Sequence, residues 1–343
     1  MTKTKNLAMS LLSLSAATLL ALATGSGASA ATSSNLGNPG ADASTVSGQS
    51  PSGASTSDYW TPERMKNAVS GDVLVGKALF RNLASIASLG VHVAPEQGGL
   101  VSIGGRKPNA ATSGATSPAV DRKASPAARP LANVGKVFFT LGGVNYVCSG
   151  NSVTSENQNT VSTAGHCVNE GPGVFATNFT FVPAYSDGAA PYGKWTAKAL
   201  YTTPQWSSKG EIQYDTGFAV VNTRNGQNLA DVVGASGVQF NAARGLAYRS
   251  FGYPAASPFD GESLKSCSGA ATNDPYNPQF NTQGIPCNMT GGSSGGPWFI
   301  GTDGTGYQNS VNSYGYGGNT GKMYGPYWGS AIQSAYQTAS GTP

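Results

Sequence analysis

The sequence predicts a mostly β protein, built from short strands that begin near residue 131. Only 10% of its 343 residues are charged, whereas 47 are glycine, and this composition is typical of turn-rich extracellular β proteins. From Val134 onward, short runs of β-branched and aromatic residues alternate with glycine turns. Because few stretches have helical spacing, the pattern favours a closed barrel or a sandwich of strands.

Individual elements follow from the same pattern in chain order. A hairpin is expected where residues 136–140 and 144–148 flank Gly142-Gly143. Further strands are expected at residues 160–163, 175–182, 195–201, 216–221, 246–253 and 297–300. The end of the chain differs, because the apolar side chains of residues 329–339 have helical spacing.

The first 30 residues have the pattern of a secretory signal. Lys3 and Lys5 precede an apolar stretch that closes on the small residues Ala28-Ser29-Ala30. A retained membrane anchor is the alternative, but serines interrupt the apolar run and a cleavage site follows it. We therefore expect residues 1–30 to be removed, and the mature protein to be secreted and to have no membrane contact.

Residues 31–130 have the composition of a propeptide or linker that is partly disordered. The stretch from Gly98 to Pro130 holds too little apolar area to order itself. Within the more structured part, Thr61-Pro62 resembles a helix start, with threonine as the cap and proline in the first turn. Basic residues between Arg122 and Arg129 are candidate processing points, and an unprocessed flexible arm is the alternative.

The charge of the chain changes at the same place. Before residue 131 there are 11 Lys and Arg against 6 Asp and Glu, and from there on 9 against 10. The later part is therefore close to neutral and lacks the clustered basic face of a nucleic-acid-binding domain. We expect no nucleic-acid partner.

Three side chains in the later part match the needs of amide hydrolysis by a serine, namely a nucleophile, a base and a group that orients the base. His166 is the only histidine after residue 131. Asp215 opens the apolar run 216–221, where it can accept a hydrogen bond from His166. Asp231 is the alternative carboxylate, and a structural role is the alternative for His166.

Ser294 lies in the run Gly291-Gly292-Ser293-Ser294-Gly295-Gly296-Pro297. The flanking glycines permit a tight turn that aims N–H groups at one point. The N–H groups of Gly292 and Ser294 would then form an oxyanion hole. A Gly/Ser-rich surface loop is the alternative, but the chain order His166, Asp215, Ser294 favours the catalytic interpretation.

Four cysteines, all after residue 131, predict two disulfides in an exported protein. Three connectivities are possible. We expect Cys148 to pair with Cys167 and Cys267 with Cys287, because each pair then lies close to one candidate catalytic segment. Zinc is the rival interpretation, but the sequence has no Cys-x-x-Cys motif. We expect no metal and no cofactor.

Three motifs resemble the active-site signatures of the chymotrypsin/trypsin-like serine peptidases: Thr163-Ala164-Gly165-His166-Cys167, Asp215-Thr216-Gly217-Phe218-Ala219 and Gly292-Ser293-Ser294-Gly295-Gly296-Pro297. The resemblance spans residues 134–343 and is closest to bacterial secreted members of the family. It implies an all-β fold of two packed six-stranded antiparallel β-barrels with a C-terminal helix, within a peptidase domain of residues 131–343. It also implies an endopeptidase that acts on proteins or peptides through an acyl-enzyme.

The same resemblance implies the roles of individual residues. His166 corresponds to the general base, Asp215 to its orienting acid and Ser294 to the nucleophile, with Gly292 and Ser294 as oxyanion donors. Ser313-Tyr314-Gly315 resembles the edge that pairs with the substrate backbone. The pairing of Cys148 with Cys167 resembles the family's histidine-loop disulfide.

Several positions depart from the family pattern. Ser293 stands where trypsin-like animal enzymes have the aspartate that binds the new N-terminal ammonium, so a zymogen of this chain should not be activated by that ion pair. No cysteine follows Ser294, so the usual disulfide across the specificity pocket is missing, and Asn288 falls at the pocket base in a gapless alignment. The absence of an obvious acid there argues against a strict Arg/Lys preference. The absence of a second histidine argues against a Glu preference.

Other functions match only parts of the sequence. An esterase could use the same triad. A peptidase fold used only for binding would normally lack one triad member, and here none is missing. A wall-associated structural protein would explain only the Gly/Ser/Ala-rich leader. The complete set therefore predicts a secreted, monomeric serine endopeptidase made as a zymogen.

Overall fold

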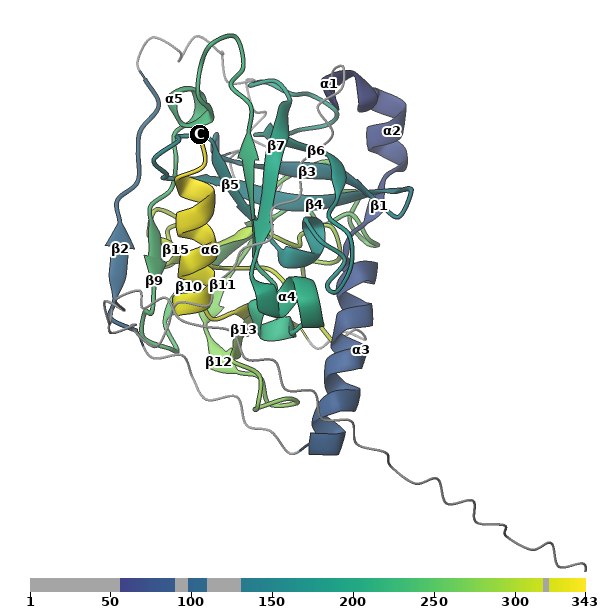
Figure 1. The fold of residues 1–343 in the computed structure, drawn as a ribbon, viewed down its shortest axis with the longest axis vertical. Coiled ribbons are helices and arrows are strands. Elements are labelled where there is room, and N and C mark those ends of the chain that lie inside the picture. The colour runs from purple at the N-terminus through teal and green to yellow at the C-terminus, as the bar shows by residue number, and fades with distance from the viewer. Residues whose placement is uncertain (1–55, 90–97, 110–130, 317–320) are drawn as a thin grey trace, which may run out of the picture. The chain divides into compact units, whose positions relative to one another are not determined.

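The computed structural model describes residues 56–89, 98–109, 131–316 and 321–343 (Figure 1). The predicted signal, residues 1–30, and the candidate processing points from Arg122 to Arg129 lie outside the described residues. In the part of the chain that is described, no helix is both long and apolar enough to cross a membrane. Most of the described elements are strands, as the sequence predicts.

The first half of the domain is a closed barrel of six antiparallel strands. These are β3 (Val134–Leu141), β4 (Val144–Val153), β5 (Thr160–Thr163), β6 (Thr177–Pro183), β7 (Trp195–Thr202) and β8 (Gly217–Val221). The barrel closes because β4 pairs with both β3 and β5, while β8 pairs with both β5 and β7. Gly142 and Gly143 turn the predicted β3–β4 hairpin with φ angles of 58° and 81°, a region that glycine enters at little cost.

The second half pairs its strands in two sheets. The larger contains β2 (Val101–Ile103), β9 (Val238–Phe240), β10 (Ala247–Gly252), β11 (Lys265–Ala270), β14 (Pro297–Ile300) and β15 (Gln308–Val311). The smaller contains β12 (Thr272–Asn273), β13 (Thr282–Pro286) and β16 (Lys322–Pro326). Two short helices, α4 (Pro204–Lys209) and α5 (Leu229–Val233), lie in loops of the first half. The predicted C-terminal helix is present as α6 (Ser330–Ser340).

Strand β2 differs from the expectation of a structureless linker after Gly98. It pairs antiparallel with β9, and Arg106 just beyond it forms an ion pair with Asp231 at 2.5 Å. An exposed strand edge offers unpaired backbone groups that a short extended segment can satisfy, whatever its composition. Pairing with β9 therefore orders residues that their own sequence would leave unstructured.

A helical segment precedes the barrel and is docked on it. It contains α1 (Thr56–Tyr59), α2 (Pro62–Asn67), the short strand β1 (Val69–Ser70) and α3 (Asp72–Leu89). The predicted cap is present, since Thr61 Oγ1 accepts a hydrogen bond from the N–H of Arg64 at 3.2 Å. Trp60 is fully buried against Phe138, and its Nε1 donates to the carbonyl of Asn178 at 2.7 Å.

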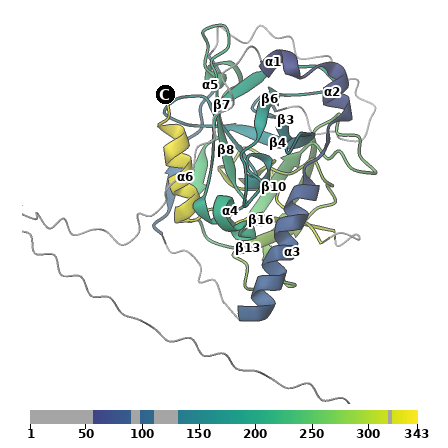
Figure 2. The same cartoon turned by 45° about the vertical axis from the view of Figure 1, so that its right-hand side comes forward.

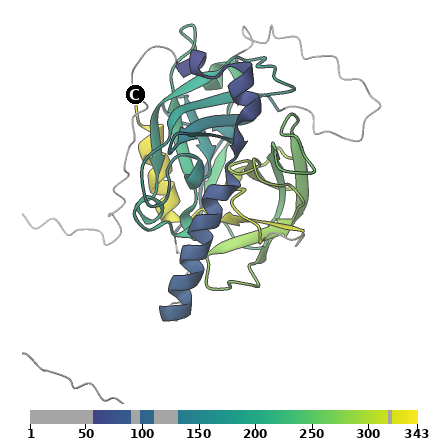
Figure 3. The same cartoon turned by 90° about the vertical axis from the view of Figure 1, so that its right-hand side faces the viewer.

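The two halves share a hydrophobic cluster where they meet. Phe138 and Val147 of the first barrel pack there with Phe251, Tyr253 and Phe299 of the second half. Figures 2 and 3 show α3 running across the seam between the teal strands of the first half and the green strands of the second. Any site built at this seam therefore takes side chains from both halves.

Substitution of Phe240 tests how much its aromatic contacts stabilise the packing of α6. Its buried ring stacks on Trp328 at 5.5 Å and lies 5.2 Å from Tyr336 of α6. Phe240→Ala should lower the free energy of unfolding by about 3–5 kcal/mol, because it removes these contacts and leaves a cavity. Phe80→Ala is the control, since that ring is 78% exposed, and it should cost less than about 0.5 kcal/mol. Denaturant unfolding in a Ser294→Ala background measures both, and equal effects would contradict the prediction.

Candidate active site

His166 and Asp215 form a buried pair joined by two hydrogen bonds. The imidazole Nδ1 lies 2.8 Å from Asp215 Oδ2, and the backbone N–H of His166 donates to Oδ1 at 2.8 Å. His166 sits on a single 3₁₀ turn (Gly165–Cys167) that follows β5, and Asp215 ends a second such turn (Ile212–Tyr214) just before β8. Because β5 and β8 are neighbours in the barrel, the fold brings the two residues together.

The local sequence explains why these groups can approach so closely. A Cβ on Gly165 would lie 2.9 Å from Asp215 Oδ1 and 3.0 Å from the ring of Trp206, so only glycine fits there. The Cys148–Cys167 disulfide ties the other side of the histidine turn to β4. The imidazole is therefore held between a disulfide, an aromatic ring and a carboxylate.

A third hydrogen bond fixes the carboxylate of Asp215. Ser313 Oγ donates to Oδ2 at 2.5 Å, so both oxygens of this fully buried group have partners. With Asp215 accepting at Nδ1, the tautomer that carries its proton on Nδ1 is favoured. His166 Nε2 is buried and has no hydrogen-bond partner among the described residues, so its lone pair is available as a base.

The loop that carries Ser294 connects β13 to β14 and depends on its glycines. Gly292 and Gly295 have φ angles of 93° and 81°, which L-residues rarely adopt. A Cβ on Gly295 would also overlap Thr163 Oγ1, next to the histidine turn. The carbonyl of Ser294 lies 4.0 Å from Cys167 Sγ. The backbone of the serine is thus fixed beside the histidine, although no hydrogen bond joins Ser294 Oγ to His166 Nε2 among the described atoms.

The predicted oxyanion donors have no acceptor in the described part of the chain. The N–H groups of Gly292 and Ser294 make no hydrogen bond there. Asn312, which the sequence analysis did not select, supports the loop by donating from Nδ2 to the carbonyls of Ser293 at 2.9 Å and Phe251 at 3.0 Å. Two free donors on a braced loop can stabilise a negatively charged oxygen.

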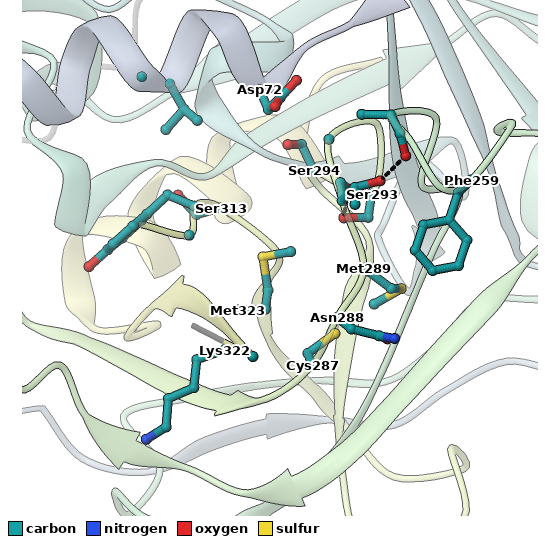
Figure 4. A pocket seen from close by; sticks show the side chains of 18 of the residues that line it. Asp72, Phe259, Cys287, Asn288, Met289, Ser293, Ser294, Ser313, Lys322 and Met323 are labelled. Carbon is teal, nitrogen blue, oxygen red and sulfur yellow. Dashed lines mark hydrogen bonds between the residues drawn. The ribbon is translucent and has the colours of Figure 1, made fainter. Parts of the chain in front are cut away.

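A cavity of about 550 Å³ lies next to Ser294. The predicted substrate-binding residues Ser313, Tyr314 and Gly315 all line it. Its wall is largely apolar, with Cys287, Met289 and Met323 among the lining residues; Asn288 also lines it (Figure 4). Lys322 extends away from its centre, and its Nζ donates to Thr272 Oγ1 at 2.8 Å. The acid among its lining residues is Asp72, which belongs to α3.

Both predicted disulfides are present. Cys148–Cys167 and Cys267–Cys287 have Cα separations of 6.4 and 5.2 Å. Cys287 lines the cavity, so the second disulfide frames the pocket without a cysteine after Ser294. Cys148, Cys167 and His166 also cluster closely enough to suggest a metal site, but zinc requires free thiolates and both sulfurs are in the disulfide.

The structure also places the alternative carboxylate, Asp231, and Ser293, the departure from the family pattern. Asp231 pairs with Arg106, whereas the carboxylate that touches His166 is that of Asp215. Ser293 is buried, and its Oγ donates to the carbonyl of Thr290 at 2.7 Å. The position where trypsin-like animal enzymes have an aspartate therefore holds a hydroxyl that is bonded within its own loop.

Asp274 is a site residue that sequence reasoning missed. This fully buried carboxylate accepts hydrogen bonds from the hydroxyls of Tyr314, at 2.8 Å, and Tyr316, and from the N–H groups of Tyr276 and Asn277 at 2.9 and 3.2 Å. Burial, together with the Asp274 charge, raises the pKa of Tyr314 well above its ordinary value, so its hydroxyl stays protonated and donates. Asp274 thereby fixes the edge that lines the cavity.

Comparisons with known proteins identify the class of protein to which this fold belongs. No family model matches the chain. The chain is similar to the solved structure of protease Anisep from Arthrobacter nicotinovorans, at 76% identity and a TM-score of 0.62, over 63% of this chain and 99% of that one. It is also similar to the thermostable serine protease AL20 from an extremophilic microorganism, at 50% identity and a TM-score of 0.60. That match covers 62% of this chain and 99% of that one. A Glu endopeptidase shares the fold at 20% identity and a TM-score of 0.50. That match covers 65% of this chain and 96% of the endopeptidase.

The fold and the relatives define a peptidase of the chymotrypsin-like class. The chain belongs to the bacterial serine proteases of this fold. A curated relative, the extracellular metalloprotease of Bacillus subtilis (strain 168), is 32% identical over 84 residues, or 24% of this chain. The chain spans about a quarter of that relative's length, 26%.

Asp274→Ala tests the anchor of the cavity edge. Removal of the carboxylate takes a charged acceptor from the buried hydroxyl of Tyr314 and from the half-buried Tyr316, so the free energy of unfolding should fall by about 1–3 kcal/mol. The KM for peptide substrates should rise more than kcat falls, because the substrate-pairing edge loosens while His166 and Asp215 keep their contacts. Asp260→Ala, at an exposed turn, is the control and should change neither quantity. An unchanged KM in Asp274→Ala would show that the edge needs no anchor.

Proposed function

We propose that the chain is a secreted serine endopeptidase that cleaves peptide bonds through an acyl-enzyme on Ser294. The observation that carries this proposal is the buried His166–Asp215 pair, which leaves His166 Nε2 free beside the glycine loop of the serine. A base held in one tautomer next to a hydroxyl is the arrangement that activates a serine for attack on a carbonyl.

In this mechanism each group has one task. His166 Nε2 accepts the proton of Ser294 as Oγ attacks the substrate carbonyl, and Asp215 stabilises the imidazolium that forms. The carbonyl oxygen becomes negatively charged and accepts hydrogen bonds from the N–H groups of Gly292 and Ser294, where loss of one donor typically costs about 10²- to 10³-fold in kcat. The imidazolium then protonates the leaving amine. Water, activated by the same histidine, releases the acyl group.

The substrate runs in a defined direction in this proposal. Residues before the cleaved bond lie along Ser313 to Gly315, and the preceding side chain enters the cavity beside Ser294. Residues after the cleaved bond leave on the other side of Ser294, along Val147 and Cys148 of β4, where the Cys148–Cys167 disulfide joins this strand to the histidine turn. The apolar cavity wall fits neither a strict Arg/Lys nor a strict Glu preference.

Secretion and processing complete the proposal. Residues 1–30 direct export and residues 31–130 form a propeptide, so that 131–343 is the active domain. The structures of protease Anisep and of serine protease AL20 match 63% and 62% of this chain over 99% of their own length. This share is close to that of residues 131–343, which are 213 of 343. The two disulfides fit an oxidising compartment. An esterase would use the same residues and is separated from an endopeptidase by the choice of substrate.

Two neighbouring serines provide a matched test of the nucleophile. Ser294→Ala should abolish covalent labelling by a fluorophosphonate probe and lower peptide cleavage by about 10⁶-fold, because no other hydroxyl can form the acyl-enzyme. Ser293→Ala should keep both activities within about tenfold, since its Oγ only braces the loop through Thr290. Mass spectrometry of the labelled peptide and a peptide library measure the two activities. Once the segment before residue 131 has been removed from both proteins by limited proteolysis, equal labelling of wild type and Ser294→Ala would refute the assignment. Ester cleavage without peptide cleavage would favour the esterase.

A further inference from the structure

Residues 69–83 occupy the cleft in which the proposed substrate would lie. Their first part is β1, a parallel strand that pairs with the part of β4 that β5 does not reach, with Val69 opposite Tyr146 and Ser70 opposite Val147. The N–H of Gly71 then donates to the carbonyl of Val147 at 3.0 Å. A Cβ on Gly71 would lie 2.8 Å from Cys148 Sγ, so the segment is pressed against the histidine-loop disulfide.

The next residue, Asp72, lies against the serine loop. Ser70 Oγ donates a hydrogen bond to its carboxylate, and a Cβ on Gly291 would overlap both side chains. Figure 4 shows Asp72 next to Ser294 at the same cavity. The Asp72 carboxylate thus lies by the loop whose free N–H groups favour a negative charge.

The following turns of α3 cover the other side of Ser294. Val75 and Ala78 are buried in a cluster with Tyr314 and Trp206. Further along, Asn82 Nδ2 donates to the carbonyl of Gly210 at 2.7 Å, and its Oδ1 accepts from the N–H of Ile212 at 3.2 Å. Residues 75–82 therefore cover the side of the cleft that the acyl part of a substrate would need.

The direction of this segment is the informative feature. From its N- to its C-terminal end it contacts Val147 first, then Gly291, then Tyr314. A substrate under the proposed function passes these places in the reverse order, from Tyr314 past Ser294 to Val147. Reversing a peptide exchanges the positions of its carbonyls and N–H groups. At Ser294 the segment consequently presents the side chain of Asp72 in place of a peptide carbonyl.

We propose that the cleft has a second, inhibitory binding mode, in which it takes a strand-helix peptide with an aspartate at the first residue of its helix, in the direction opposite to that of a substrate. Residues 69–83 are the ligand of this mode in the chain itself. They cover Ser294 and escape its attack, because no scissile carbonyl is aimed at the oxyanion donors. The inference rests on the proposed function for the direction of the substrate.

Two glycines of the same segment give a matched test in the full chain. Gly71→Ala places a methyl group against Cys148 Sγ, whereas a Cβ on Gly76 has no atom within 4 Å. Gly71→Ala should label with a fluorophosphonate at least about tenfold faster than wild type, because the overlap weakens docking. Gly76→Ala should label no faster than wild type, since alanine favours the helix. Fast labelling of the wild-type chain, or no gain from Gly71→Ala, would overturn the inference.

A measurement that does not depend on catalysis separates this inference from the proposed function. In a Ser294→Ala background, amide hydrogen exchange of residues 69–83 should be slow and should accelerate with Gly71→Ala but not with Gly76→Ala. Rapid exchange in the parent would refute docking, whatever Ser294 does. If exchange behaves as expected while trimming of the N-terminal region by an added protease never yields a labelled Ser294, the proposed function fails instead.

The reversed direction has its own readout. Purified chain with intact Ser294 should show no Ser294-dependent cut between Ser70 and Val75, as judged by mass spectrometry against the Ser294→Ala variant. A Ser294-dependent cut beside Asp72 would show that the segment binds as a substrate does, and would overturn the reversed mode.

Discussion

The contacts of Ser149 join the two halves of the molecule at the active site. This residue of β4 follows Cys148, and its N–H donates to the carbonyl of Ser294 at 2.7 Å. Its Oγ donates to the carbonyl of Gly292 at 3.0 Å and accepts from the N–H of Tyr253 at 2.8 Å. The first barrel carries His166 and Asp215, whereas the second half carries Ser294. Ser149 therefore links the backbone that follows Cys148 directly to the backbone of the serine loop in the other half.

The sequence predicted the parts of the site that lie in continuous motifs. Glycines around His166 and Ser294 indicate that other groups approach the backbone closely, and the cysteine beside His166 indicates a disulfide. Both features could be predicted because they depend on residues that are neighbours in the sequence. The β3–β4 hairpin and the Thr61 cap were predictable for the same reason. Strands such as β11 and β15, rich in serine, glycine and asparagine, carry no strand signal of their own and form because a neighbouring strand pairs with them.

The residues that sequence reasoning missed act through partners far along the chain. Asp274 looks like a turn former before Pro275, and nothing nearby indicates that Tyr314 will donate to it. Asn312, just after β15, and Ser149 of β4 contact the serine loop from distant parts of the chain. The docking of residues 69–83 could not be predicted either, because the sequence of an amphipathic helix does not indicate which surface the helix packs against. Such contacts become apparent only when the chain is folded.

Ser293 and the segment 69–83 have a common implication for regulation. Without an aspartate at position 293, the serine loop has no carboxylate to which a new N-terminal ammonium could pair, and the loop is already braced by Asn312 and Ser149. The loop therefore needs no ion pair to take its shape. Under the proposed function, control then lies in whether the cleft is covered, and removal of the covering segment is the activating event.

The most direct test of this account is the rate of fluorophosphonate labelling in Ser149→Ala, once the segment before residue 131 has been removed by limited proteolysis. The matched control is Ser152→Ala, since this buried hydroxyl of the same strand has no hydrogen-bond partner among the described residues. The account predicts a fall of about tenfold or more for Ser149→Ala, because the serine loop loses its brace, and no change for Ser152→Ala. Equal rates in the two variants would contradict it.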